Sequence, residues 1–397
     1  MNQQLQTLQK HVKTNKYIIW LRTQVFSAKT VTVRGHTVKL YPLRLAAVLL
    51  ALALVLILLV ELVILPYQAP RAVDAAAFES GSGYALQPYQ GTMLLSDAGG
   101  TTALTRGGKV RWEVSDAKTN PLTDTDGDYY LRTEPGSGNK TSIYRGDRLI
   151  RTFESDHTVI TAKVNRHGYA AIAAEETGYK GMVTVYDNDG QPLYTWHSGE
   201  GYITDVDLSK NGQYLVVAQL MSDAETAYTR ILFIDIRRDE TVASMQREGA
   251  LVSSLTFLEN DTLIAVSDID VTAYTRTGEE QYSFSLTGKD PSLFAVSDQL
   301  LVFLCTDGRG NSVLEIYRAG NGAYSGSYTA NDQIQCLAVN GNIIAAGTRK
   351  DVLYISPSGK CKRTVTLPHD VNALGLFSDK RTVLAVGGNQ AHLLRIR

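Results

Sequence analysis

Two series of tight turns recur along the chain after residue 66, and their common spacing constrains the fold more than any other feature. The first series lies at Gly107-Gly108, Gly146-Asp147, Asp189-Gly190, Arg238-Asp239, Thr277-Gly278, Asn321-Gly322 and Ser358-Gly359. The second series precedes the most apolar strand of each unit, at His167-Gly168, Asn211-Gly212, Asn260-Asp261, Asp298, Asn340-Gly341 and Ser378-Asp379. Both series advance by about 42 residues per step. Two interleaved series with one mean step indicate a repeated structural unit.

Each unit contains four short strands. In the segment from Ile203 to Arg247 they read ITDVDLS, QYLVVAQL, TRILFIDI and TVASMQR. Apolar and polar residues alternate in these runs, and no segment after residue 66 shows a sustained helical period. Four strands in roughly 40–45 residues are typical of a β-propeller blade. The sequence therefore predicts an all-β domain built as a propeller.

The length of the repeat region gives the number of blades. Residues 71–397 comprise 327 residues, or about 7.8 steps of 42, which predicts eight blades. Seven blades are the alternative if Gly83–Ser115 is not a full blade. The last unit, 371–397, has only three strands. We expect the apolar strand at 72–78 to join it as the fourth and to close the ring, so that the propeller comprises 72–397.

A long apolar segment precedes the propeller. Leu45 to Leu65 contains 21 residues with one charged residue, Glu61, near its end. As a helix it is about 31 Å long, close to the thickness of the hydrocarbon core of a bilayer. We predict a single transmembrane helix over 45–65, joined to the propeller by a short linker, 66–71. Its apolar core is longer than that of a typical signal peptide, although the alanines at 75–77 leave cleavage open.

Charge is distributed unevenly around this segment. Residues 1–44 contain eight Lys and Arg and no acidic residue, whereas all 40 acidic and 31 of the 39 basic residues follow. Basic segments stay in the cytoplasm. We therefore predict a single-pass protein of the cell membrane with a cytoplasmic tail, 1–44, and an extracytoplasmic propeller. The mildly acidic propeller argues against nucleic acid as a partner.

Residues 29–41 (KTVTVRGHTVKLY) alternate Thr and Val around Arg34-Gly35, which predicts a small hairpin in the tail. The three cysteines, Cys305, Cys336 and Cys361, are too few and too widely spaced for a disulfide framework or a zinc site. We expect them to be small, buried apolar residues within strands.

The segment Gly107-Gly108-Lys109-Val110-Arg111-Trp112 resembles the Gly-Lys-x-x-Trp strand of quinoprotein-like (PQQ-type) propeller repeats. The other units place Trp196, Phe153, Phe284 or Tyr328 near the corresponding position. The whole layout is similar to an uncharacterised bacterial family with a basic tail, one anchor helix and an outer propeller of quinoprotein-like or WD40-like repeats. The resemblance implies a fold and a location, and it carries over no catalytic residue.

The predicted loop Asp124-Thr125-Asp126-Gly127-Asp128 is the strongest local candidate for a ligand-binding motif. Alternating carboxylates can surround Ca²⁺, so Asp124, Asp126 and Asp128 are candidate calcium ligands. Gly127 lies too early for the usual calcium loop, and Pro135 stands where the bidentate Glu is expected, so a polar loop is the simpler interpretation. Asp187-Asn188-Asp189-Gly190 looks similar but coincides with a predicted hairpin turn.

Three classes of function fit these observations. The leading hypothesis is a membrane-anchored scaffold whose loops bind another envelope protein or a cell-wall polymer, with no cofactor. The second is an extracytoplasmic hydrolase, lyase or quinone-linked dehydrogenase with its site at the propeller axis. The third is a single-pass sensor that reports to a cytoplasmic partner. The sequence contains no Walker loop, Gly-x-Ser-x-Gly or His-Glu-x-x-His motif, which favours the scaffold.

Overall fold

The computed structural model describes residues 29–33, 36–40, 42–60, 70–73, 84–223, 226–388 and 390–395. The chain divides into two compact units, residues 1–68 with 397, and residues 69–396. Each unit is described by itself.

The first unit contains a hairpin and one helix. β1 (Lys29–Val33) pairs with β2 (His36–Leu40) in antiparallel register, which confirms the predicted hairpin. α3 (Pro42–Leu59) follows, with proline at its first position, where the missing N–H costs no hydrogen bond. Ten large apolar side chains on α3, from Val48 to Leu59, are between 47% and 67% exposed.

The predicted transmembrane segment, 45–65, overlaps α3. Within the described residues, no helix combines the length and apolar character needed to cross a bilayer. Residues 61–65, together with residues 1–28 of the tail, lie outside the described part of the chain. The membrane anchor therefore stays a prediction.

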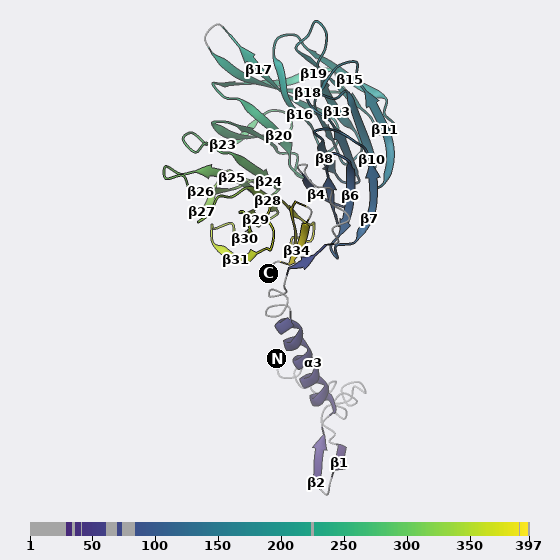
Figure 1. Cartoon of the computed structure of the whole chain (residues 1–397), viewed down its shortest axis with the longest axis vertical. Helices are drawn as coiled ribbons and strands as arrows, with labels where there is room; N and C mark the ends of the chain where they lie inside the picture. The colour runs from purple at the N-terminus through teal and green to yellow at the C-terminus, as the bar shows by residue number, and fades with distance from the viewer. Residues whose placement is uncertain are drawn as a thin grey trace, which may run out of the picture. The chain divides into compact units, whose positions relative to one another are not determined.

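The second unit consists of eight four-stranded antiparallel sheets that follow one another around a ring (Figure 1). Sheet 1 contains β4 (Ala85–Tyr89), β5 (Thr92–Ser96), β6 (Gly100–Thr105) and β7 (Val110–Ser115). Sheet 2 contains β8 (Leu122–Asp126), β9 (Tyr129–Thr133), β10 (Lys140–Arg145) and β11 (Arg148–Glu154). Sheet 3 contains β12 (Val159–Val164), β13 (Ala170–Ala174), β14 (Gly181–Tyr186) and β15 (Pro192–Ser198). Sheet 4 contains β16 (Tyr202–Leu208), β17 (Tyr214–Ser222), β18 (Ala227–Asp235) and β19 (Glu240–Glu248).

The other four sheets repeat this order. Sheet 5 contains β20 (Val252–Phe257), β21 (Leu263–Ser267), β22 (Asp270–Tyr274) and β23 (Glu280–Ser285). Sheet 6 contains β24 (Leu293–Val296), β25 (Leu300–Thr306), β26 (Ser312–Arg318) and β27 (Tyr324–Thr329). Sheet 7 contains β28 (Cys336–Asn340), β29 (Ile343–Gly347), β30 (Asp351–Ile355) and β31 (Cys361–Thr366). Sheet 8 contains β32 (Ala373–Leu376), β33 (Thr382–Gly387), β34 (Gln390–Arg395) and β3 (Arg71–Ala72).

The hydrophobic core is divided into eight clusters, one at each interface between neighbouring sheets. One cluster joins sheets 3 and 4 through Val185 and Val206, and another joins sheets 8 and 1 through Val386 and Met93. The other six clusters fill the remaining interfaces in the same way. Eight interfaces among eight sheets mean that the ring is closed. The eight-bladed propeller is confirmed, and the seven-bladed alternative is wrong.

Sheet 8 contains strands from both ends of the unit. β3 pairs with β34, so that Arg71 lies opposite Leu393 and Ala72 opposite His392. This strand begins one residue before the segment 72–78 that we expected there, and residues 74–78 lie outside the described part of the chain. Val73 follows β3 and is buried in the cluster between sheets 8 and 1.

Turn chemistry sets the hairpins, as the sequence indicated. In the turn between β14 and β15, the Asp187 carboxylate accepts hydrogen bonds from the N–H groups of Asp189 and Gln191. Gly190 has a φ of 74°, which favours glycine. At Gly359, whose φ is also 74°, a Cβ atom would lie 2.0 Å from the Ser327 carbonyl oxygen of the neighbouring sheet. Glycine is therefore needed there for both conformation and space.

Candidate functional site

The propeller has two faces, which differ in the connections that form them. The turn face consists of the turns between the first and second strands, and between the third and fourth strands, of each sheet. The loop face consists of the connections between second and third strands and between consecutive sheets. Because β3 is antiparallel to β34, which runs toward the turn face, the chain enters the propeller at its turn face.

A cavity of about 440 Å³ opens at the centre of the turn face. The residues that line it come from seven of the eight sheets, which places the cavity on the propeller axis. They include Gln90, Asp126, Lys210, Glu259, Asp298, Asn340 and Ser378. An enzyme with its site at the axis would be expected to combine carboxylates and histidines there. Carboxylates line this cavity, but none of the described lining residues is a histidine.

Ion pairs connect the sheets along one side of this cavity. Asp126 of sheet 2 accepts from Lys210 of sheet 4 at 3.0 Å and from Arg166 of sheet 3 at 3.3 Å. Arg166 also donates to both carboxylate oxygens of Glu259, in sheet 5, at 2.6 Å. Four consecutive sheets are therefore joined by charge-assisted hydrogen bonds around the axis. These contacts give the axial residues a structural role.

The three candidate calcium ligands do not converge on one point. Asp124 pairs with Lys163 at 3.5 Å, Asp126 pairs with Lys210 and Arg166, and Asp128 pairs with Arg145 at 2.9 Å. Across the described ranges, no group of three or more His, Cys, Asp and Glu side chains is arranged to hold a metal ion. Asp124 and Asp126 lie on β8 and Asp128 in the turn after it, so the predicted loop is mostly strand. Calcium at these three residues stays a prediction, and the observed pairing favours a structural role.

Carboxylates on first strands connect sheet 2 to sheet 3 and sheet 4 to sheet 5. Asp205 and Asp207 on β16 accept hydrogen bonds from the N–H groups of Leu255 and Phe257 on β20, at 2.8 and 2.7 Å. Asp124 on β8 does the same for Val164 on β12 at 2.9 Å. These bonds satisfy backbone groups at the inner edge of the next sheet.

One lysine, Lys163, interacts electrostatically with this group of carboxylates. The negative charge of Asp124, with smaller contributions from Asp205 and Asp207, raises the pKa of Lys163. Burial raises the pKa of Asp205, and it raises the pKa of Asp207 to about 7. Three carboxylates share one ammonium group, so Asp207 is protonated readily at neutral pH.

The loop face is strongly acidic, whereas the turn face is balanced. Ten acidic and ten basic residues lie in the described connections of the turn face. The described connections of the loop face contain thirteen acidic and six basic residues, a net charge of −7. The acidic residues are Asp97, Asp116, Glu134, Asp156, Glu175, Glu176, Glu200, Asp223, Asp268, Asp290, Asp307, Asp332 and Asp370, and the basic residues are Lys118, Lys180, Lys289, Arg309, Arg349 and Lys350.

Exposed apolar side chains lie at the centre of the same face. Tyr202, Leu251, Leu293 and Phe294 are 58%, 42%, 39% and 38% exposed. They stand at or just before the loop-face ends of the first strands of sheets 4, 5 and 6, next to the axis. We call these four residues the apolar rim.

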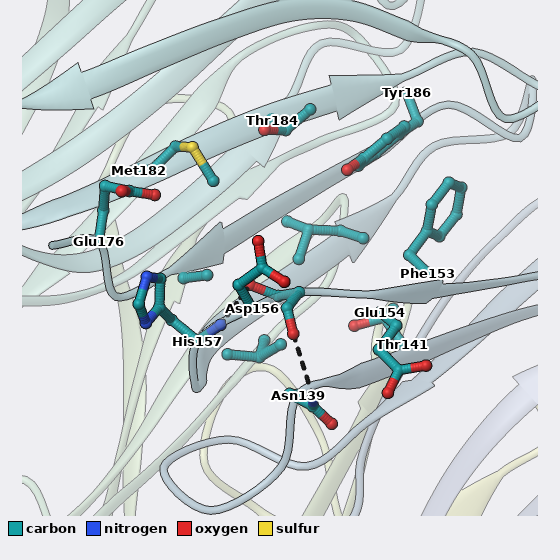
Figure 2. Close-up of a pocket in the computed structure, with 14 residues that line it drawn as sticks. Asn139, Thr141, Phe153, Glu154, Asp156, His157, Glu176, Met182, Thr184 and Tyr186 are labelled. Atoms are coloured by element: carbon teal, nitrogen blue, oxygen red, sulfur yellow. Dashed lines mark hydrogen bonds between the residues drawn. The ribbon is translucent and has the colours of Figure 1, made fainter.

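A pocket of about 210 Å³ opens on the loop face between sheets 2 and 3. Figure 2 shows Asp156 in its middle, with His157 and Glu176 on one side and Phe153 and Tyr186 on the other. The two aromatic rings are in contact, with centroids 4.1 Å apart. Aromatic faces together with carboxylates are the groups that hold an ammonium or guanidinium ion.

The loop beside this pocket is ordered by its own hydrogen bonds. Asn139 donates to the Ser155 carbonyl at 3.0 Å, and the Ser155 hydroxyl accepts from the His157 N–H at 3.1 Å (Figure 2). The His157 ring lies 3.4 Å from the Thr177 hydroxyl. The carboxylates of Asp156 and Glu176 have no ion-pair partner among the residues that the structure describes. They remain available to a ligand.

Among the described residues, the other histidines and the cysteines form no comparable site. Nε2 of His369 and Nδ1 of His392 are 2.8 Å apart, at the interface between sheets 7 and 8. Cys305 and Cys336 are buried and Cys361 is exposed, and all three are free thiols. All three lie within strands as predicted, but the prediction that they are buried is wrong for Cys361, which lies on an outermost strand.

Trp112, which carries the Gly-Lys-x-x-Trp resemblance, packs between sheets. Its ring stacks on Tyr130 of sheet 2, with centroids 6.0 Å apart. Phe153 and Phe284, at the corresponding positions of sheets 2 and 5, stack on Tyr186 and Tyr317 of the following sheets. The recurring aromatic residue therefore holds neighbouring sheets together.

Sequence reasoning did not find the loop-face site. Its acidic residues are scattered over twelve connections, and the pocket is formed by segments whose proximity depends on how sheets 2 and 3 pack. The sequence contains one signal of this site, which is the position of the acidic residues relative to the two series of turns. Sorting charged residues by connection type would have revealed the difference between the two faces.

These features define a β-propeller with a balanced face, where the chain enters, and an acidic face with an apolar rim and a pocket. The chain belongs to a protein family of unknown function, DUF5711, whose model matches residues 66–396. Among curated proteins, the sequence finds no match.

The fold is similar to solved propellers of the WD40-like type. Sqt1 from Saccharomyces cerevisiae is 10% identical, with a TM-score of 0.59 over 80% of this chain and 97% of that chain. The β-propeller domain of Cps50 (Swd1) from Myceliophteria thermophila is 12% identical, with a TM-score of 0.49 over 81% and 98% of the two chains. A chain of the Mitotic Checkpoint Complex is 14% identical, with a TM-score of 0.47 over 70% and 87%. At these identities the similarity concerns the fold alone, and it lends no support to PQQ-type repeats.

Proposed function

We propose that this protein is a binding scaffold whose loop face recognises a partner protein with a basic surface. The observation that carries the proposal is the net charge of −7 on the described loop-face connections, beside a turn face that is balanced. A charge of one sign on one face steers an oppositely charged partner toward it and selects against others.

The apolar rim supplies the contact area that charge alone does not. Protein interfaces bury apolar and aromatic residues at their centre and keep polar residues at their margin. Tyr202, Leu251, Leu293 and Phe294 occupy the centre of the loop face, and the acidic connections surround them. This is the arrangement expected of an interface with a partner that carries an apolar centre and a basic margin.

The pocket between sheets 2 and 3 is suited to one cationic side chain of that partner. Asp156 and Glu176 offer carboxylates without a described ion pair, and Tyr186 offers an aromatic ring, which Phe153 supports from behind. A lysine or arginine inserted there would gain both an ion pair and a cation–π contact.

We further propose that the propeller is held at the outer surface of the cell membrane, with the N-terminus in the cytoplasm. An apolar helix with ten large side chains about half exposed requires a nonpolar environment, and a bilayer supplies it. The basic tail, residues 1–44, sets this orientation. The partner would then be an envelope protein.

Site-specific photo-crosslinking in intact cells tests the scaffold. A photo-reactive amino acid at Phe294, in the apolar rim, should yield a discrete crosslinked product. The same residue at Asn188, an exposed position on the turn face, should not. The crosslinked peptide of the partner, identified by mass spectrometry, should carry lysine or arginine next to an apolar residue.

Charge reversal then tests the recognition itself. Asp156→Lys with Glu176→Lys should abolish the product at Phe294, whereas Asp187→Lys with Asp189→Lys on the turn face should leave it unchanged. Equal products from Phe294 and Asn188, or a product that resists both reversals, would contradict the proposal.

A further inference from the structure

A second group of exposed apolar residues lies at the other end of the sheets. Val110, Leu149, Ile150 and Leu193 are 44%, 50%, 36% and 47% exposed. They stand at the turn-face starts of β7, β11 and β15, the fourth and outermost strands of three consecutive sheets. The fourth strands are the outermost, so these residues form an arc along the outer strands of sheets 1 to 3.

Corresponding positions elsewhere in the ring are mostly polar. β19 starts with Glu240 and Thr241, and β23 starts with Glu280 and Gln281. Tyr324, at the start of β27 in sheet 6, is the exception, and it lies on a different part of the ring. The apolar arc is therefore a local feature of sheets 1 to 3.

Basic residues accompany the arc. Arg111 follows Val110, and Arg148 and Arg151 flank Leu149 and Ile150. All three arginines are exposed, and none forms an ion pair with an acidic residue in the part of the chain that the structure describes. Asp147, in the turn before Arg148, is the acidic residue closest to them in sequence.

We propose that this arc, Val110, Leu149, Ile150 and Leu193 with the three arginines, rests on the surface of an anionic lipid bilayer. The inference depends on the proposed membrane anchor. Apolar side chains enter the headgroup boundary, while arginines extend along it toward lipid phosphates. The exposed guanidinium groups match anionic lipid in charge, which favours a bilayer over a neutral surface. Arg151 also donates to the Asp189 carbonyl and lies over the Phe153 ring.

The chain enters the propeller on the side where the arc lies. It enters at the turn face of sheet 8, which adjoins sheet 1, and the arc lies at the turn face of sheets 1 to 3. Five residues, 66–70, separate the end of the predicted anchor from Arg71, a reach of at most about 17 Å. This reach limits how far the propeller can lie from the predicted anchor.

Fluorescence quenching on the full-length chain in vesicles tests this contact. Cys361→Ser removes the exposed thiol and leaves two buried ones. Leu149→Cys or Leu193→Cys is then labelled with an environment-sensitive dye. The matched controls are Thr241→Cys, at the corresponding position of sheet 4, and Glu200→Cys, on the loop face.

In vesicles of phosphatidylcholine with phosphatidylglycerol, the labels at 149 and 193 should lose most of their quenching by aqueous iodide. They should also be quenched by nitroxide-bearing lipids, and the two controls should show neither effect. Arg148→Glu with Arg151→Glu should restore iodide quenching at position 193.

Two results would overturn the inference. Labels at 149 and 193 that stay open to iodide in anionic vesicles would show that the arc does not touch lipid. Equal protection in detergent solution would show that a protein, or a second copy of this chain, covers the arc instead. Resistance of the same samples to alkaline extraction reports on the anchor separately, so failure of the anchor is distinguishable from failure of the lipid contact.

Discussion

The buried guanidinium group of Arg132 should contribute more to stability than any exposed ion pair of the propeller. Arg132, on β9 in sheet 2, is completely buried. It donates to the Asp97 carbonyl at 2.7 Å, to the Thr101 hydroxyl at 2.9 Å and to the Gly100 carbonyl, all three in sheet 1. Burial lowers its pKa, and the nearby Asp116 opposes this effect.

The size of the effect follows from these contacts. Arg132→Ala removes three charge-assisted hydrogen bonds between sheets 1 and 2 and the ion pair with Asp116 at 3.7 Å, which leaves Lys118 as the one ion-pair partner of Asp116 among the described residues. Breaking a buried pair in this way costs about 3–5 kcal/mol. The control is Arg145→Ala in the same sheet. Arg145 and Asp128 are 57% and 50% exposed, so losing that pair should cost about 0–1 kcal/mol.

Urea denaturation of the full-length chain in detergent, followed by tryptophan fluorescence, measures both variants. Trp112 stacks at the interface that Arg132 joins, so its emission reports on the relevant sheets. A third variant, Arg132→Lys, keeps the charge but loses the planar group and should fall between the two. A cost below about 1 kcal/mol for Arg132→Ala would mean that desolvation of the guanidinium cancels its bonds, which refutes the reasoning.

Two predictions concern pH. Because burial raises the pKa of Asp207 to about 7, the folded protein binds a proton that the unfolded chain has released, and stability should fall as pH rises from about 4 to 7. Asp207→Asn, which can still accept from Phe257, should reduce this slope in urea titrations at pH 5 and pH 8; an unchanged slope would contradict the assignment. Burial and the neighbouring His369 lower the pKa of His392, so its contribution to stability should be present above about pH 6.5 and lost on acidification. His392→Asn should be less sensitive than the parent chain to a change from pH 7.5 to 5.5 in thermal unfolding, and equal sensitivity would exclude His392 as the cause.

The fold could be predicted because its determinants are local in sequence. Aspartate and glycine at such spacing, as in Asp187 and Gly190, favour a turn through local interactions. The four strands of each repeat follow from the alternation of apolar and polar residues over short segments. Counting repeats then predicted eight blades, which the eight interfaces confirm. The last sheet was predictable for the same reason, because a unit with three strands requires a fourth from elsewhere.

The site depends on contacts that no local pattern encodes. Arg166 and Glu259 are 93 residues apart, and Lys210 and Asp126 are 84 apart. The sequence around Asp124 resembles a calcium-binding loop because its partner is distant in the chain. In the structure that partner is Lys163 of the next sheet. Arg132 gives no sequence signal at all, because a buried arginine and an exposed one look alike in a strand.

The pairing of β3 with β34 has a consequence for how the protein is made. Ala72 and His392 are 320 residues apart, and closing a loop of that length costs about 5 kcal/mol of chain entropy. During synthesis β3 leaves the ribosome long before its partner strand exists, so sheets 1 and 8 keep unpaired faces until the last residues emerge. Contacts between such distant segments also slow folding. We therefore expect newly made chains to pass through a long-lived open ring that folding factors must protect from aggregation.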